Sequence, residues 1–220
     1  MPALQKTCRV LRSDTRGHGL SAVFPGPYTI EQLARDVLAV LDELKINQVH
    51  FCGLSMGGLI GLWLGIYAPE RVTRLVLCNS GAKIGAAEMW NARIAKVRAG
   101  GMAAIADSTI ERWFSRDFIA TCPQEIASVR KVLLETPPEG YSYCCEAVRD
   151  ADLRQTASRV SAPTLVIAGT HDVATPPADG QFVAARIRGA RYVEFNASHL
   201  SNIEAAGPFT SELVGFLTTS

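Results

Sequence analysis

The segment FCGLSMGGLIG, residues 51–61, places one serine among glycines at a spacing that suits a nucleophile. An apolar run ends at Ser55 and a glycine-tolerant apolar run follows, so the serine is predicted to lie at a strand-to-helix turn. Such a turn strains the backbone, and the small residues two positions away, Gly53 and Gly57, are expected to relieve its clashes. The following helix would point its N-terminus at the Ser55 hydroxyl, which makes the Met56 N–H the predicted oxyanion donor.

A dinucleotide-binding fingerprint is the alternative interpretation of the same glycines. The pattern G-x-G-x-x-G requires glycine at position 55 and an acidic residue about 20 positions later, at the end of the next strand. Serine occupies position 55, and the next predicted strand ends in Cys78 and Asn79. The pattern therefore favours a nucleophilic serine, and we expect no metal and no organic cofactor.

A serine hydroxyl becomes an effective nucleophile when a histidine accepts its proton and a carboxylate orients that histidine. His199 follows the last predicted strand, which is the position expected for the general base. Asp172 follows the strand TLVIAG, so its carboxylate would project from the same edge of the sheet. Asp179 and Glu204 are weaker candidates, because Asp179 falls in or near a predicted helix and Glu204 is close enough to His199 for a local polar contact.

Strands alternate with helices along the chain. Apolar, β-rich runs predict strands at residues 8–14, 48–53, 74–79, 164–169 and 191–195. One helix is predicted to begin at a capping box formed by Thr29 and Gln32. Further helices are predicted near residues 55–67, 177–187 and 209–217. This order predicts an α/β fold: a mostly parallel sheet with helices on both faces and functional groups at the carboxyl ends of the strands.

One long segment interrupts the alternation. Residues 83–151 contain amphipathic helical stretches and no convincing strand. We therefore expect a helical cap at 83–151, inserted between a first part of the core at 1–82 and a second part at 152–220.

Composition excludes several classes of function. The 220 residues include 22 basic and 21 acidic side chains with no run of like charge, so neither a nucleic acid nor a membrane surface is an expected partner. No apolar run approaches the roughly 20 residues that a membrane span needs, and the N-terminus lacks the apolar core of a signal peptide. Six cysteines without a CxxC pair are interpreted as reduced and structural. A cytoplasmic protein is expected, and its oligomeric state stays open.

Several segments together resemble a known family. They are DTRGHGLS, GLSMGG, PERVTRLVLCNS, KIGAAEMWNARIAKVRAGGMAA, PTLVIAGTHDVATPPADG and SHLSNIE. Over essentially the whole chain they are similar to the 3-oxoadipate enol-lactonases, which are α/β-hydrolase fold enzymes of the bacterial β-ketoadipate pathway of aromatic catabolism. GLSMGG and the THD and SHL turns are shared by many α/β-hydrolases, whereas KIGAAEMWNARI and ATPPADG are more particular to the lactonases.

The resemblance implies a role for each candidate residue. Ser55 would be the nucleophile, Asp172 the orienting acid and His199 the general base of a cofactor-free hydrolysis of the enol-lactone through an acyl-enzyme. A general carboxylesterase of the same fold is the alternative function. The family's lactone carries a carboxylate, so the site should offer a cation in a mostly apolar pocket.

Trp90 and Arg93 are the sequence candidates for substrate binding, because residues three apart on a helix share a face. The indole would cover the lactone ring and the guanidinium would pair with the carboxylate. The alternative is that Trp90 packs the cap onto the core and Arg93 is solvated, while Trp113 is assigned to cap packing.

The resemblance also shows one departure. In the family, three strands and a helix precede the strand that residues 8–14 match, and the loop after the third strand supplies a second oxyanion amide. Met1 falls inside what should be the end of that helix, so the N-terminal strands of the usual fold are expected to be absent. A hydrolase-fold chain with impaired catalysis is therefore a further alternative, since one lost oxyanion donor costs about 100-fold to 1,000-fold in turnover.

Overall fold

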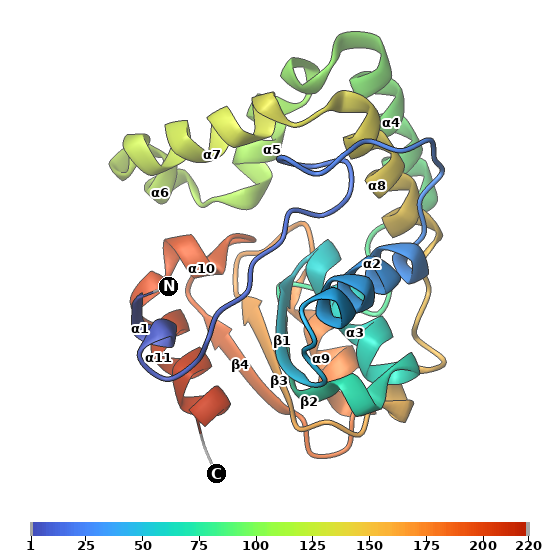
Figure 1. The fold of residues 1–220 in the computed structure, drawn as a ribbon. Coiled ribbons are helices and arrows are strands. Elements are labelled where there is room, and N and C mark those ends of the chain that lie inside the picture. The colour runs from blue at the N-terminus through green and yellow to red at the C-terminus, as the bar shows by residue number, and fades with distance from the viewer. Residues whose placement is uncertain (1, 219–220) are drawn as a thin grey trace.

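A four-stranded parallel sheet lies between two layers of helices in the computed structural model, which describes residues 2–218 (Figure 1). Its strands pair in chain order: β1 (Val49–Leu54), β2 (Val72–Cys78), β3 (Thr164–Gly169) and β4 (Arg191–Phe195). All four carboxyl ends therefore lie at one edge of the sheet. The predictions of strands at 48–53, 74–79, 164–169 and 191–195 are confirmed to within two residues.

Helices connect and flank these strands. Those next to the sheet are α1 (Pro2–Gln5), α2 (Ile30–Glu43), α3 (Met56–Tyr67), α9 (Pro177–Arg186), α10 (Ser201–Glu204) and α11 (Ala206–Thr218). Between β2 and β3 lie α4 (Ala87–Gly100), α5 (Ala106–Trp113), α6 (Arg116–Thr121), α7 (Pro123–Glu135) and α8 (Pro138–Asp150). The predicted capping of α2 is confirmed, because the Thr29 hydroxyl accepts a hydrogen bond from the Gln32 N–H.

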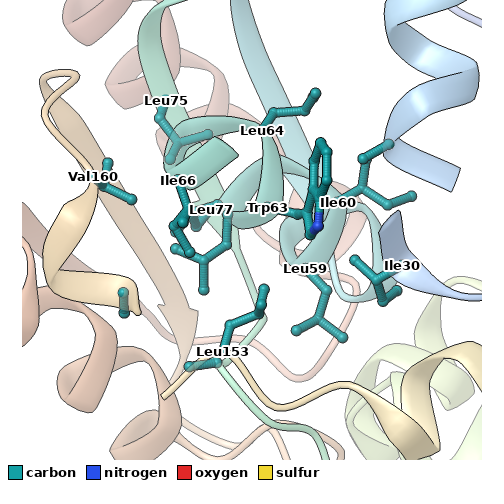
Figure 2. Close-up of a cluster of buried hydrophobic side chains, with 14 of the residues drawn as sticks. Ile30, Leu59, Ile60, Trp63, Leu64, Ile66, Leu75, Leu77, Leu153 and Val160 are labelled. Carbon is teal, nitrogen blue, oxygen red and sulfur yellow. The ribbon is translucent and has the colours of Figure 1, made fainter. Parts of the chain in front are cut away.

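One face of the sheet is covered by α2, α3 and α9. Helix α3 is apolar on all sides, which suits a helix buried between a sheet and a second helix. Figure 2 shows this cluster, to which α3 contributes Leu59 and Trp63, α2 contributes Ile30, and β2 contributes Leu75 and Leu77. The burial of these side chains holds the start of α3 firmly against the sheet.

The opposite face is covered by α11, with α1 beside it. Alternate residues of a strand point to opposite faces, so Val76 and Ile167 pack against Phe209 and Leu213 of α11. Helices thus cover both faces of the parallel sheet, as the alternating pattern predicts.

The predicted strand at residues 8–14 is wrong. The chain there is extended but pairs with no strand among residues 2–218, and Leu11 is 47% exposed. An extended segment becomes a strand only when a neighbour satisfies its backbone groups, and the sheet of the described residues ends at β1. Residues 8–14 instead lead from α1 toward the helices above the sheet (dark blue in Figure 1).

Helices α4–α8 form a separate layer above the carboxyl edge of the sheet (Figure 1). This layer has a small core of its own, formed by Val97, Met102, Ile105, Ala106 and Leu133. We use the name cap for residues 83–151, in which the structure contains helices and no strand. Across residues 2–218, no helix combines the length and the apolar composition that crossing a bilayer requires.

Candidate active site

Ser55 lies on the sharp turn between β1 and α3. Its backbone has φ 55° and ψ −116°, a conformation that L-residues rarely adopt and that often marks a functional position. The turn is held by hydrogen bonds: the Ser55 N–H donates to the Cys78 carbonyl (2.9 Å), and the Ser80 hydroxyl donates to the Ser55 carbonyl (2.8 Å). The strained serine is therefore tied to the neighbouring strand β2.

The glycines around Ser55 differ in whether a larger side chain would fit at their positions. A Cβ on Gly53 would overlap the backbone of Gly57, so position 53 requires glycine. The expectation that Gly57 relieves a similar clash is wrong, because a Cβ at that position would meet no atom within 4 Å. Gly58 is the second residue that must be small, since its Cβ would overlap the Ser80 side chain.

Asp172 and His199 form a buried pair at the same edge of the sheet. Asp172 follows β3 and His199 follows β4, and the carboxylate Oδ2 lies 2.8 Å from the histidine Nδ1. The two residues are only 3% and 2% exposed. With its Nδ1–H donated to Asp172, the imidazole presents Nε2 as the proton acceptor.

Other donors saturate the Asp172 carboxylate. Its Oδ1 accepts the backbone N–H groups of Ala174 (2.8 Å) and Thr175 (2.9 Å), while Oδ2 also accepts the Thr175 hydroxyl (2.7 Å) and the Asn79 amide (3.0 Å). Burial alone would favour the neutral carboxyl. The hydrogen bonds from His199, Thr175 and Asn79 outweigh it and hold the pKa of Asp172 below its ordinary value. Asp172 is therefore a stable anion beside the imidazole.

Asn79 was missed as a site residue by reasoning from the sequence. It follows β2 at φ 43°, and it links Asp172 to the Ser198 carbonyl (3.2 Å) and the Ser201 hydroxyl (2.5 Å). Its position as the last residue of the strand predicted at 74–79 was the available signal. Thr175 carried no such signal, because its contact depends on the fold of the loop that follows β3.

Glu204 makes the local polar contact that the sequence suggested. Its carboxylate accepts the N–H of Ser198 (2.9 Å), next to His199, and lies 3.4 Å from the N–H of Ser115 in the cap. Asp179 lies in the first turn of α9, and the structure shows no hydrogen bond between it and His199 among the described residues. Of the three acids considered, Asp172 alone is hydrogen bonded to the imidazole in the part of the chain described.

The cap contacts the histidine directly. Trp113, at the end of α5, stacks on the His199 ring with centroids 6.4 Å apart and planes inclined by 30°. Its carbonyl accepts the N–H of Leu200 (3.0 Å). The sequence assigned Trp113 to cap packing, and in the structure it also forms one side of the imidazole's surroundings.

Trp90 and Arg93 use their polar atoms within the cap. The Trp90 indole N–H donates to the Ile84 carbonyl (2.7 Å). Arg93 donates to the hydroxyls of Tyr141 (2.6 Å) and Thr109 (2.5 Å), and its guanidinium lies 5.6 Å from the Tyr141 ring centroid. Both are partly buried on α4, and neither is shown in contact with Ser55 or His199.

A cleft of about 650 Å³ lies between the cap and the loop after β3. It is lined by Ala82, Lys83, Gly85, Ala86, Met89, Arg112, Arg154, Val173, Ala174, Pro176, Ala178, Asp179 and Phe182. Neither Ser55 nor His199 is among these residues, but the lining residue Ala174 donates its N–H to Asp172. The described residues contain no cluster of three metal-ligating side chains.

Comparison with known proteins identifies the family to which the chain belongs. The model of the alpha/beta hydrolase family matches residues 1–211. The chain belongs to this family. It is 46% identical over 200 residues to 3-oxoadipate enol-lactonase 2 of Acinetobacter baylyi, an alignment that covers 91% of this chain and 75% of that protein.

Solved structures agree with the family assignment. The enol-lactonase of Burkholderia xenovorans LB400 is 51% identical and superposes with a TM-score of 0.98, covering 99% of this chain and 84% of that one. A thermophilic esterase of Thermogutta terrifontis is 28% identical with a TM-score of 0.87, covering 93% and 77%. This α/β-hydrolase is thus similar both to enol-lactonases and, more distantly, to an esterase.

Proposed function

We propose that this α/β-hydrolase opens the ring of 3-oxoadipate enol-lactone with water to give 3-oxoadipate. The observation that carries the proposal is the buried, hydrogen-bonded Asp172–His199 pair at the sheet edge where Ser55 lies. The sequence similarity to named enol-lactonases supports the choice of substrate. The reaction is a serine-dependent hydrolysis of a carboxylic ester.

The chemistry follows from the roles of the three residues. The Ser55 Oγ attacks the ring carbonyl while His199 accepts its proton, and the imidazolium forms beside the Asp172 carboxylate. The ring C–O bond then breaks, and His199 returns the proton to the departing enolate oxygen, whose enol tautomerises to the ketone. Water activated by His199 hydrolyses the acyl-enzyme and restores Ser55.

Met56 is the proposed oxyanion donor. It is the first residue of α3, so its backbone N–H has no acceptor within the helix and points toward the space at the helix N-terminus. The positive end of the helix dipole adds to the stabilisation of the negative oxygen that develops in the transition state.

In the cap, Trp90 is proposed to cover the lactone ring and Arg93 to contribute positive charge for the substrate carboxylate. Arg93 donates only to neutral hydroxyls in the hydrogen bonds described, so its charge is not neutralised by them. The proposed division into core residues 1–82, cap residues 83–151 and core residues 152–220 gives the two parts separate tasks: the core holds the triad and the cap selects the substrate.

The small-molecule lactone is the proposed partner, and the proposed location is the cytoplasm. All six cysteines are free thiols, which is the state that a reducing compartment maintains.

The test is hydrolysis of 3-oxoadipate enol-lactone by the purified chain, followed as loss of ultraviolet absorbance. Turnover by the wild type that Ser55→Ala abolishes is the expected result. A folded chain that leaves the lactone intact but hydrolyses neutral esters would instead make it a general carboxylesterase, the activity that the similar esterase structure suggests. A folded chain inactive on both substrates would overturn the proposal and leave a hydrolase fold with impaired catalysis.

A further inference from the structure

The segment that carries His199 lies between the core and the cap. It comprises residues 196–204, from the end of β4 through α10, and Figure 1 shows α10 facing the cap helices. From the core, the Asn79 amide donates to the carbonyl of Ser198 (3.2 Å). This bond fixes the carbonyl of the residue before His199, and the N–H of the same residue takes its acceptor from elsewhere.

On the other side, the segment contacts the short connection between two cap helices. Trp113 ends α5 and Ser115 is the N-cap residue of α6. The Trp113 carbonyl accepts the N–H of Leu200 (3.0 Å), and the Trp113 ring stacks on His199. The imidazole is therefore placed against the cap as well as against the core.

The Glu204 carboxylate joins these two parts of the molecule. Its Oε2 accepts the N–H of Ser198 (2.9 Å), and both of its oxygens lie 3.4 Å from the nitrogen of Ser115, a longer contact that the two oxygens share. A carboxylate suits this place because it accepts several N–H donors at once, and its charge strengthens each bond. One side chain thus ties the residue before the base to the cap.

Loss of this carboxylate would leave a buried donor without its acceptor. Ser198 is only 4% exposed, and an unpaired backbone N–H is costly at a buried position. Without Glu204, the Ser198 N–H must stay unpaired or turn toward another acceptor. Either outcome shifts the backbone that carries the imidazole.

We propose that Glu204 is a positioning residue, which acts through Ser198 and Ser115 to hold His199 against both Asp172 and the cap. This inference rests on the proposed serine-dependent hydrolysis, in which His199 is the general base, and it deepens that function without depending on which ester is the substrate. Glu204 itself takes no part in proton transfer.

Kinetics of Glu204→Ala test the role. Because small displacements of a catalytic group are costly, kcat should fall about 30-fold with KM changed less than about 2-fold. The loss should be the same on the lactone and on neutral 4-nitrophenyl acetate, since both reactions need the base. Glu204→Gln keeps one acceptor oxygen and should recover part of the loss.

Glu111→Ala is the matched control, because it removes a carboxylate from an exposed position on α5. Its kcat should match that of the wild type. Thermal unfolding of each variant separates positioning from stability. A Glu204→Ala variant that unfolds at a lower temperature, yet keeps the wild-type kcat while folded, would overturn the inference.

The cap side of the tie is tested at Ser115. Proline removes its N–H without straining the chain, because Ser115 has φ −67° and the preceding Phe114 is extended (φ −131°, ψ 152°). Ser115→Ala is the control, since it loses the hydroxyl that caps α6 but keeps the N–H.

The kcat of Ser115→Pro should be about 5-fold below that of Ser115→Ala, in line with one lost hydrogen bond to a charged group. In the Glu204→Ala background the two Ser115 variants should have the same kcat. Equal kcat for both variants in the wild-type background would overturn the tie between the base and the cap.

Proton NMR separates this inference from the proposed function. The Nδ1 proton between His199 and Asp172 should give a low-field resonance that His199→Gln abolishes. In Glu204→Ala this proton should exchange with water about 10-fold faster than in the wild type and in Glu111→Ala. Faster exchange in a chain that hydrolyses no ester would refute the hydrolase and still support the positioning role. Unchanged exchange, or no such resonance in the wild type, would overturn that role.

Discussion

Asp172 at the sheet edge is buried, and Arg112 in the cleft wall is partly buried. The two charged groups differ in the hydrogen bonds that surround them. Asp172 accepts hydrogen bonds from Asn79, Ala174, Thr175 and His199. Arg112 contacts the Met89 sulfur; burial and the charge of Arg93 lower its pKa, and the Asp172 carboxylate raises it. The carboxylate has its partners within the protein, whereas the guanidinium lies in the wall of a cleft.

The difference lies in how each charge is held. A buried charge whose bonds are complete cannot rotate without losing them, so Asp172 holds the imidazole in one orientation. Arg112 is partly buried, and the charge of the Asp172 carboxylate acts on it against the effects of burial and of Arg93. The carboxylate at the sheet edge is thus fixed by several hydrogen bonds within the protein, and the guanidinium on the cap side is not.

The largest effect is expected from removing the charge that is fully paired. Asp172→Asn keeps the size of the side chain but cannot hold His199 in the required tautomer, so kcat should fall about 10⁴-fold with little change in KM. Steady-state kinetics on the lactone measure this loss. Asp179→Asn is the comparison variant and should lose less than about 10-fold; equal losses would give Asp179 a share in orienting the imidazole.

A smaller effect is expected at the second cap arginine. Arg93→Ala should lower kcat/KM for the anionic lactone about 10-fold, because it removes positive charge beside Arg112, and should spare neutral esters. The two substrates are to be assayed with the same enzyme preparation. Parallel losses on lactone and ester would refute a role for Arg93 in carboxylate binding and leave it a structural residue of the cap, bonded to Tyr141 and Thr109.

The smallest effect is on stability in acid. The folded-state pKa of Asp172 lies below its ordinary value of 3.8. A group of this kind contributes stability that is present above its unfolded pKa and is lost as the pH falls through the folded one. The unfolding free energy of the wild type should therefore fall below about pH 4 more steeply than that of Asp172→Asn. Denaturant titrations between about pH 6 and pH 3 measure it, and identical slopes would show that the pairing of Asp172 adds nothing to stability.

Much of the candidate site at the sheet edge was predictable because its signals are local. Ser55, Asp172 and His199 each follow a recognisable apolar strand, and parallel strands bring their carboxyl ends to one edge. Gly53 could be assigned for the same reason, since its neighbour in the clash is only four residues away. The sequence could not tell which of Gly57 and Gly58 must be small, because the side chain that would clash belongs to Ser80.

The cleft side was not predictable, because its contacts join residues far apart in the chain. The stacking of Trp113 on His199 and the presence of Arg112 and Ala174 in the lining of one cleft depend on how the cap packs onto the core. The prediction of a strand at residues 8–14 failed for a related reason, since a strand is defined by its neighbour as well as by its own side chains.

The sequence by itself determined the α/β order, the nucleophile turn and the identity of the triad candidates, because apolar periodicity and strand-end positions are properties of short segments. The tertiary structure alone decided which acid meets the histidine, which donors keep that acid ionised, and which arginine has no carboxylate partner among the described residues. These outcomes depend on distances between separate segments, and such distances are set by packing rather than by local pattern.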